Sequence, residues 1–440
     1  MRTMTGQPAA AGSEDQRGAA APRAGAAPGR PLLPGRPGRP DVFTFGETMV
    51  ALRGSGPLKL GGTMNVSIAG AESNVAIGLA RLGHDVRWAG AVGEDEAGQL
   101  VLRTLRAEGV GVSGASTDPG APTGLLLFEP RLPEVTRVHY YRAGSAGSRI
   151  GADVIQRAFS AAPPRVLHLT GITPSLSPTA RAAARLALQL ARESGSLVCL
   201  DVNFRARLWT AEAAAEVLRE WIPFVDVLIA SDDELPLCLP GGWGGEGSPG
   251  GGEGSQGAKG ATGANGDLRA EGAGAGMGAE GADGGLGAEG ADGGLARWAS
   301  EQKEATAAGA GACGDAVPLP PQEVADDPAA AVARQAGLLL DQGVGEVVVK
   351  LGVEGATTFT HGGSLHQPAK PLRAVDAVGA GDAFVAGYLS ALLDGEGPAG
   401  RLERAVTTGA FAVASSGDWE GAPTRAELGM LGASPGTVVR

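Results

Sequence analysis

From residue 42 onward, short apolar runs alternate with longer segments in which apolar residues recur every three or four positions. Short apolar runs are typical of buried strands, and they occur at 42–45, 86–91, 166–169, 197–202, 225–230 and 347–351. Helical spacing is found at 71–82, 97–108, 178–193, 211–221, 329–340, 381–393 and 402–415. Because strands and helices alternate so regularly, we expect parallel βαβ units, and therefore an α/β fold in which helices cover both faces of a mainly parallel sheet.

One stretch departs from this alternation. Residues 123–128 and 135–141 both look like strands, no helical segment separates them, and only the second alternates polar with apolar residues. Strands that follow one another in the chain usually lie side by side. We therefore expect a small β-sheet around residues 121–141 that projects from the main body.

The distribution of glycine divides the chain further. The sequence has 74 glycines among 440 residues, and 27 of them lie within 241–316, where the nonapeptide 278–286 is repeated at 287–295. Two copies are too few for a solenoid, and a segment with so few apolar residues cannot offset the entropy lost on ordering. We expect a low-complexity insertion without chemistry at 241–325, a disordered leader at 1–40, and one domain at 41–430 that contains the insertion.

Charge and cysteine content exclude several classes of protein. The formal net charge is −12 and no basic face stands out, which argues against a nucleic-acid partner. No run of about 18 apolar residues occurs, so we expect no membrane-spanning helix. Cys199, Cys238 and Cys313 lie far apart, which argues against a disulfide framework or a cysteine-rich zinc site and fits a cytoplasmic protein.

The strongest candidate for chemistry is the segment Asp-Ala-Val-Gly-Ala-Gly-Asp at 376–382, directly before a predicted helix. Gly379, Ala380 and Gly381 leave backbone N–H groups free to face an anion, and the positive end of the helix dipole adds to this. Like charges repel, so Asp382 is better suited to act as a general base on a hydroxyl that attacks a phosphoryl group than to contact phosphate. A helix N-cap after a glycine-rich turn, without catalytic role, has the same pattern.

A second candidate segment lies between Gly61 and Asn74. Gly70 allows a ligand to approach the backbone closely, and the Asn74 side chain offers both a donor and an acceptor to hydroxyl groups. Turns rich in Gly and Asn often have no function, so this segment gains weight only in combination with the first.

In this order, about 300 residues apart, the two segments resemble those of the PfkB (ribokinase-like) family of carbohydrate kinases. The resemblance covers about 41–430 apart from the insertion. It implies a ribokinase-like three-layer sandwich with a mainly parallel sheet, and a small β lid over the sugar, formed here by about 55–70 and 120–142. It also implies ATP and Mg²⁺ as cofactors and, as in similar kinases, a homodimer formed through the lid.

Further segments, at 140–146, 168–172, 201–205, 208–209 and 417–423, resemble those of 2-keto-3-deoxygluconate kinases. This resemblance implies that Tyr140, Arg142 and Arg205 hold a sugar acid. Planar guanidinium groups pair well with a carboxylate, and a neutral sugar would leave both arginines without a partner. A surface ion pair remains the alternative for each arginine.

The resemblance also assigns residues to the nucleotide side. It implies that Glu234, in Ser-Asp-Asp-Glu at 231–234, is associated indirectly with Mg²⁺ and phosphate. It further implies that ATP is contacted by Ser231, Lys350, Gly352, Gly355, Gly379 and Gly381. A lysine at the end of a strand, without a role in binding, is the alternative for Lys350.

We therefore expect an ATP-dependent kinase that phosphorylates the terminal hydroxyl of 2-keto-3-deoxygluconate to give the 6-phosphate. The nearest alternative is a PfkB kinase for a neutral ketose or pentose, such as fructose or ribose. A non-catalytic sugar-acid sensor with the same fold is a further alternative, which the intact Asp382 and glycine-rich turn disfavour. An NAD-dependent dehydrogenase is disfavoured because no Gly-x-Gly-x-x-Gly follows the first strand.

Overall fold

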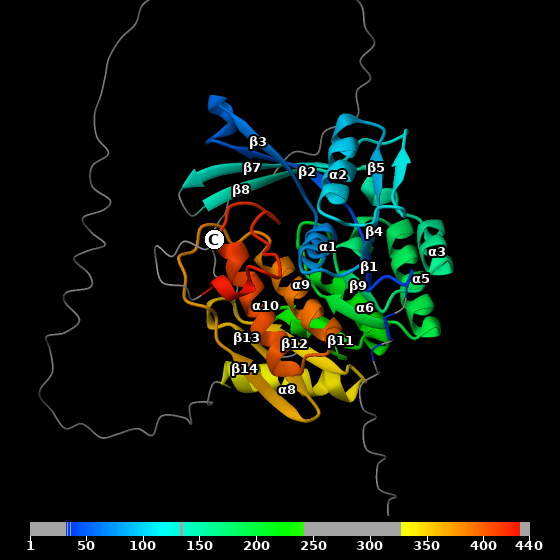
Figure 1. The fold of residues 1–440 in the computed structure, drawn as a ribbon, viewed down its shortest axis with the longest axis vertical. Helices are drawn as coiled ribbons and strands as arrows, with labels where there is room; N and C mark the ends of the chain where they lie inside the picture. The colour runs from blue at the N-terminus through cyan, green and yellow to red at the C-terminus, as the bar shows by residue number, and fades with distance from the viewer. Residues whose placement is uncertain (1–31, 33, 36, 133–134, 242–326, 432–440) are drawn as a thin grey trace, which may run out of the picture. The chain divides into compact units, whose positions relative to one another are not determined.

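The computed structural model describes residues 32, 34–35, 37–132, 135–241 and 327–431, and its centre is an eight-stranded sheet (Figure 1). The strand order is β14-β13-β12-β11-β10-β9-β1-β4. A hairpin, β13 (Ala356–Thr360) and β14 (Gly363–Gln367), is antiparallel to its neighbours. The other six strands are parallel: β1 (Val42–Phe45), β4 (Val86–Ala89), β9 (Val166–Thr170), β10 (Leu197–Asp201), β11 (Val227–Ser231) and β12 (Glu346–Lys350). The predicted α/β fold with a mainly parallel sheet is confirmed.

Helices cover both faces of this sheet, which makes the three-layer sandwich. Successive residues of a strand point to opposite faces, and in β11 Leu228 and Ala230 pack into one core while Val227 and Ile229 pack into the other. The first core is shared with α3 (Ala152–Ala161), α5 (Pro178–Ser194), α6 (Ala211–Trp221) and α8 (Pro328–Asp341). The second is shared with α1 (Ala71–Arg81), α2 (Glu96–Ala107), α9 (Ala380–Leu393) and α10 (Pro398–Val413).

Helix α9, which carries the predicted base, is the most enclosed of these helices. Every residue from Ala383 to Leu393 is buried, and α9 packs against both α1 and α10. A helix that is apolar on all sides requires protein on all sides. The N-terminus of α9 is therefore held in a fixed position relative to the sheet.

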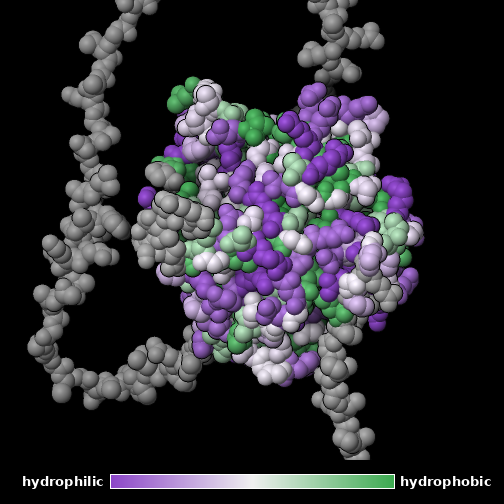
Figure 2. Space-filling model, in the orientation of Figure 1, coloured by the Kyte–Doolittle hydropathy of each residue, from purple (hydrophilic) through white to green (hydrophobic). Residues whose placement is uncertain are grey.

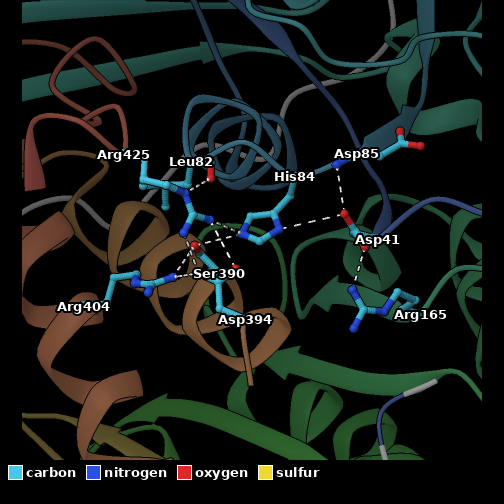
Figure 3. Close-up of polar contacts among 9 residues, drawn as sticks. All are labelled: Asp41, Leu82, His84, Asp85, Arg165, Ser390, Asp394, Arg404 and Arg425. Carbon is cyan, nitrogen blue, oxygen red and sulfur yellow. Dashed lines mark hydrogen bonds and ion pairs between the residues drawn. The ribbon is translucent and has the colours of Figure 1, made fainter. Parts of the chain in front are cut away.

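The far end of α9 is held by a polar cluster around His84 (Figure 3). The Nε2 atom of His84 lies 2.9 Å from Ser390 Oγ on α9 and 3.3 Å from a terminal nitrogen of Arg425. Arg425 also pairs at 2.7 Å with Asp394, directly after α9. Asp41, which precedes β1, lies 3.8 Å from His84 Nδ1. The cluster thus joins the ends of α1 and α9 to the C-terminal segment and to β1.

A second sheet of four strands, which we call the lid, lies at the top of Figure 1. Its order is β3-β2-β7-β8, with β2 (Met49–Gly54), β3 (Met64–Ala69), β7 (Leu125–Leu132) and β8 (Val135–Tyr141). The predicted lid segments 55–70 and 120–142 contain β3, β7 and β8, whereas β2 lies wholly before them and was not predicted. A strand was predicted at 42–45 but none at 49–54, although Met-Val-Ala-Leu at 49–52 is a short apolar run.

The surface in Figure 2 is mostly hydrophilic on the face shown, with apolar residues at its lid end. Large apolar side chains exposed on the lid include Leu60, Met64, Val66, Leu132 and Tyr141. Across the part of the chain that the structure describes, no helix is both long and apolar enough to cross a membrane. The predicted insertion lies outside the described residues apart from Gly241, and so does most of the predicted leader.

Candidate active site

The candidate site lies where neighbouring parallel strands end and the N-termini of two helices meet. β10 ends at Asp201, β11 at Ser231 and β12 at Lys350. Helices α1 and α9 begin beside each other, since the side chain of Asn74 on α1 contacts that of Asp382 on α9. Gly381, in the first turn of α9, lies close to the ammonium group of Lys350 at the end of β12. The carboxyl edge of a parallel sheet is the usual position of ligand sites in α/β folds.

Asn74 and Asp382, one from each of the two sequence motifs, are in contact. Asn74 Nδ2 donates to Asp382 Oδ2 at 2.8 Å, across 308 positions of sequence. Asn74 Oδ1 is buried and accepts no hydrogen bond, so it is available to a ligand hydroxyl. Gly70 precedes α1, and a Cβ there would lie 2.5 Å from the Glu47 carbonyl oxygen. Gly70 therefore allows the close packing that positions Asn74.

The conformation of the turn before α9 is fixed by contacts of its own residues and of Asp418. The Asp376 carboxylate accepts from Val378 N at 3.1 Å, and Gly379 adopts φ 76°, a left-handed conformation that favours glycine. A Cβ at Gly379 would lie 1.8 Å from the Asp418 carbonyl oxygen, so no other residue fits there. Ala380 N donates to the Ala377 carbonyl at 3.3 Å, which leaves it less available than predicted. The next N–H groups of the first turn have no acceptor within the helix.

Asp382 is the third residue of α9, where its environment disfavours ionisation. Burial raises the pKa of Asp382 to about 7, and the charge of Asp201 contributes in the same direction. The hydrogen bond from Asn74 and the positive charges of Arg205 and Lys350 act against this increase. A carboxyl group with a pKa near neutrality is suited to exchange protons at physiological pH.

Lys350 lies among three carboxylates. Its Nζ donates to Asp201 Oδ1 at 2.8 Å, and a Cβ at Gly381 would lie 3.8 Å from that Nζ. Burial disfavours the ammonium form, yet Asp201 and Glu234 outweigh it, so the pKa of Lys350 is raised. The Lys350 ammonium is therefore charged and faces the first turn of α9.

Asp201 and Asn203 lie at the candidate site, in the segment 201–205 that carried the resemblance, but only Arg205 of that segment was assigned a role. Asn203 is the one non-glycine residue in the described ranges with a positive φ, 42°. Its Nδ2 donates to Asp201 Oδ2 at 3.3 Å, and both residues are buried. Strained conformations of this kind cluster at functional sites. A signal was present, because Asp201 is a charged residue at the end of an apolar run.

Arg142 has a partner within the protein. Its guanidinium forms an ion pair with Glu47, whose side chain is 1% exposed and also accepts from Ser145. The expectation that a neutral sugar would leave both arginines without a partner is therefore wrong for Arg142. The Arg142 guanidinium also lies 5.9 Å from the ring centre of Tyr140 on β8. Tyr140, on β8 of the lid, and Arg142, directly after that strand, are thus close together, but Arg142 is not a free cation.

Arg205 differs from Arg142. It is exposed, and its guanidinium donates to the Phe204 carbonyl at 3.2 Å. Its positive charge acts on Asp382 and lowers the pKa of that carboxyl. Arg205 therefore lies near the predicted base, in a position that a ligand carboxylate can reach from solvent.

Gly355, a predicted nucleotide contact, and Glu234, predicted to act indirectly on Mg²⁺, both have clear structural roles. Gly355 has φ 104°, and a Cβ there would lie 2.1 Å from the Gln367 carbonyl oxygen, so a turn requires this glycine. The two Glu234 oxygens accept from Phe204 N at 2.7 Å and Ser231 N at 2.8 Å. Gly352, in contrast, has open space around its Cβ position and remains available for close approach of a ligand.

These contacts limit how magnesium could be held. Within the described residues, no group of three or more His, Cys, Asp or Glu side chains could hold a metal ion. Mg²⁺ in such sites is typically bound by substrate phosphates with one or two carboxylates and water. Because both Glu234 oxygens already accept backbone N–H groups, that residue fits an indirect contact with the ion.

The chain is similar to several known carbohydrate kinases. A 2-dehydro-3-deoxygluconokinase of Thermoproteus tenax is 29% identical over 389 residues, which cover 87% of this chain and 91% of that protein. A probable fructokinase-4 of Arabidopsis thaliana is 33% identical over 173 residues, covering 38% and 51%. A crystal structure of a PfkB protein from Polaromonas sp. JS666 has a TM-score of 0.61 and 30% identity, covering 89% of this chain and 99% of that one. Because residues 39–239 and 319–425 match the model of the pfkB family carbohydrate kinases, this chain belongs to that family and is an ATP-dependent carbohydrate kinase.

Proposed function

We propose that this kinase phosphorylates the terminal hydroxyl of 2-keto-3-deoxygluconate, giving the 6-phosphate, with Asp382 as the general base. The observation that carries this proposal is the Asp382 carboxyl, whose pKa burial raises to about 7, at the end of a glycine-rich turn that exposes backbone N–H groups. The similarity to a 2-dehydro-3-deoxygluconokinase over most of both chains supports the choice of substrate.

In the proposed reaction, Asp382 takes the proton of the sugar hydroxyl as its oxygen attacks the γ-phosphorus of ATP. The bond between the γ-phosphorus and the bridging oxygen breaks, and ADP leaves with that electron pair. The first-turn N–H groups of α9, with Gly379 and Gly381 allowing close approach, would stabilise the negative charge on the transferring group. Lys350 would add positive charge on the same side. Mg²⁺, when bound with the nucleotide, would neutralise phosphate charge.

The acid end of the sugar would be held by the exposed Arg205, with Tyr140 and Arg142 lining the lid side. Arg142 is already paired with Glu47, so Arg205 is the residue that supplies an uncompensated cation to the carboxylate. Gly70 and Asn74 would hold sugar hydroxyls, and the free Oδ1 of Asn74 fits this role. Closure of the lid would exclude water, which otherwise competes as acceptor of the phosphoryl group.

The central experiment replaces Asp382 with Asn, which keeps the size of the side chain and removes the base. We expect kcat for ADP release to fall by about 10²–10⁴-fold, while Asp341→Asn, an exposed position on α8, retains wild-type turnover. Near-normal turnover of Asp382→Asn with ATP and the sugar acid would contradict the proposed base.

The substrate class is tested separately, by a coupled ADP-release screen over sugar acids, including the gluconate- and galactonate-derived epimers, and neutral sugars. We expect Arg205→Ala to lower kcat/KM for the sugar acid by about 10–100-fold, the usual effect of losing a hydrogen bond to a charged group. Arg185, exposed on α5 and paired with Glu220, provides the matched control. Fructose or ribose turnover that Arg205→Ala leaves intact would favour a neutral-sugar kinase, an alternative that the fructokinase relative supports.

We further propose that two copies associate through the lid, as expected for such kinases. The exposed apolar residues Met64, Val66 and Tyr141 would be covered by the partner, and β3 and β8 form the free edges of the lid sheet. Sedimentation of the wild type and of Val66→Lys tests this, since a monomeric wild type would contradict it. The free thiols of Cys199 and Cys238 fit a reducing compartment such as the cytoplasm.

A further inference from the structure

The lid is joined to the glycine-rich turn by one arginine, Arg53 on β2. One terminal nitrogen of Arg53 lies 3.1 Å from Asp376 Oδ2, and the other lies 2.7 Å from Asp418 Oδ2. The guanidinium also stacks 4.0 Å from the ring centre of Phe128 on β7. We propose that Arg53 is a positioning residue for phosphoryl transfer, which ties the lid to the anion-binding turn by bridging Asp376 and Asp418. This inference rests on the proposal that the turn at 376–382 binds the transferring phosphoryl group.

Both carboxylates held by Arg53 belong to residues that shape this turn. Asp376 accepts from Val378 N through its other oxygen, so its carboxylate fixes the backbone N–H of the residue directly before Gly379. Asp418 presses its carbonyl oxygen against the α-carbon of Gly379, where a Cβ would lie only 1.8 Å away. Arg53 therefore contacts both residues, Asp376 and Asp418, that constrain the backbone leading into α9.

The C-terminal segment that contains Asp418 also contacts the lid directly. Trp419 Nε1 donates to the Ile68 carbonyl on β3 at 3.1 Å, and Ser67 donates to Glu420. β3 leads through Gly70 into α1 and Asn74. The same lid strands thus lead to the sugar side of the site and, through Arg53 and Trp419, to its phosphate side. A sugar that orders the lid would also order the turn.

The charges in this contact make the arginine difficult to replace. The Arg53 and Asp376 side chains are 19% and 22% exposed, and that of Asp418 is 9% exposed. Burial raises the pKa of Asp418 to about 6, against the opposing effect of Arg53. Without Arg53 the two carboxylates would repel each other in a poorly hydrated position. A lysine ammonium, as a compact point charge, does not reproduce a planar bridge between two carboxylates.

The test compares Arg53→Ala, Arg53→Lys and a matched control, Arg401→Ala. Arg401 is 21% exposed and pairs at 2.6 Å with the buried Glu346, at the opposite end of β12 from Lys350. We expect both Arg53 variants to lose kcat, the Ala variant on the order of 100-fold as for a misplaced catalytic group, with smaller changes in KM. Arg401→Ala should lose stability but keep kcat.

Two further measurements separate positioning from general stability. Millimolar guanidinium chloride should restore part of the kcat of Arg53→Ala relative to sodium chloride at equal ionic strength, and should not raise that of the wild type or of Arg401→Ala. Calorimetry without sugar gives the ratio of the affinity for a non-hydrolysable ATP analogue to the affinity for ADP. This ratio should fall in both Arg53 variants and keep its wild-type value in Arg401→Ala. Wild-type kcat and affinity ratio in Arg53→Lys, or equal losses in Arg53→Ala and Arg401→Ala, would overturn the proposal.

These outcomes are independent of which sugar is the substrate. Turnover is measured with whichever sugar the wild type phosphorylates, and the affinity ratio requires no sugar. A wild type that accepts only neutral sugars would contradict the proposed substrate while the Arg53 test stands. If Arg53→Ala does not fold, Arg53→Lys, which retains charge and most of the volume, gives both readouts.

Discussion

At the scale of single residues, Asp382 can serve as the proposed base only when its carboxyl group is ionised, so its pKa should set the pH range of turnover. Because burial raises this pKa to about 7, we expect kcat/KM to fall as the pH decreases below about 7, approaching tenfold per pH unit. Lys350 lowers the pKa of Asp382, so removing that positive charge should move the acid limb of the profile to higher pH.

The measurement is the pH profile of kcat/KM for the wild type, Lys350→Met and the control Lys370→Met. Lys370 pairs with Glu403 on the surface, so its replacement should leave the acid limb in place. An acid limb that is the same in Lys350→Met as in the wild type would contradict the electrostatic coupling between Lys350 and the base.

Gly379 gives a second prediction at this scale. Its φ is 76°, and a Cβ at this position would lie 1.8 Å from the Asp418 carbonyl oxygen, so there is no room for a side chain. We expect Gly379→Ala to cost about 1–3 kcal/mol of stability and to lower kcat on the order of 100-fold, because the turn must move. Gly337 in α8 has open space at its Cβ position, so Gly337→Ala should gain roughly 0.5–1 kcal/mol and keep wild-type kcat. Thermal unfolding and steady-state kinetics measure both effects.

At the scale of elements, the sequence predicted the helices and strands whose apolar residues all face a single environment. Helix α6 was predicted at 211–221 and extends from Ala211 to Trp221, because its apolar residues face a single core and Thr210 caps it. The hairpin β13–β14 was missed. Its strands lie at the sheet edge, with β14 exposed along most of its length, so no apolar run marks it. Edge strands owe their position to pairing with a neighbour, which the local pattern does not contain.

The His84 cluster makes a prediction about how α9 is held. Burial lowers the pKa of His84, and Arg425 and Arg404 act in the same direction against Asp394 and Asp41. The folded protein therefore binds fewer protons at His84 than the unfolded chain does below the unfolded pKa of about 6.5, and stability should decrease as the pH falls through that range. His84→Gln lacks this titration, so its melting temperature should fall less than that of the wild type between about pH 7.5 and 5.5.

His361→Gln, at an exposed turn, is the control and should follow the wild type. The low pKa of about 4 at the buried His168 is common to all three proteins and cancels in the comparison. Parallel curves for His84→Gln and the wild type would mean that folding does not change the protonation of His84 in this pH range, and would contradict the prediction.

At the scale of the whole molecule, the site is assembled from segments that are far apart in sequence. The motifs identified Asn74 and Asp382, because glycine-rich turns at helix starts leave a local pattern. They did not reveal that Glu47 pairs with Arg142 or that Arg53 bridges to Asp418. Such partners follow from strand order and from how the lid packs, neither of which any local window of sequence contains. The residue types at the site were therefore predictable, and the charge balance between them was not.

The segment 242–326 gives the last prediction. The family model matches the chain on either side of residues 240–318, and α8, which follows the segment, packs against η4 (Leu235–Cys238), which precedes it. Because η4 and α8 are in contact, we expect that a short linker can join residues 241 and 327. The low apolar content of this segment predicts a connection without packed structure. For such a connection, a roughly tenfold shortening reduces the entropy cost of closure by on the order of 2 kcal/mol, so we expect a higher melting temperature with unchanged kcat and KM.

A Gly/Ser segment of the original length is the informative control for this deletion. If the segment acts only as a connection, the length-matched replacement should keep both the melting temperature and the kinetic constants of the wild type. A loss of kcat in both replacements would mean that the acidic, repeated sequence itself contributes to turnover. A loss of kcat with the short linker alone would mean that the ends of η4 and α8 require a longer connection. The short linker would then strain η4 and α8, which lie next to Glu234 and the end of β11.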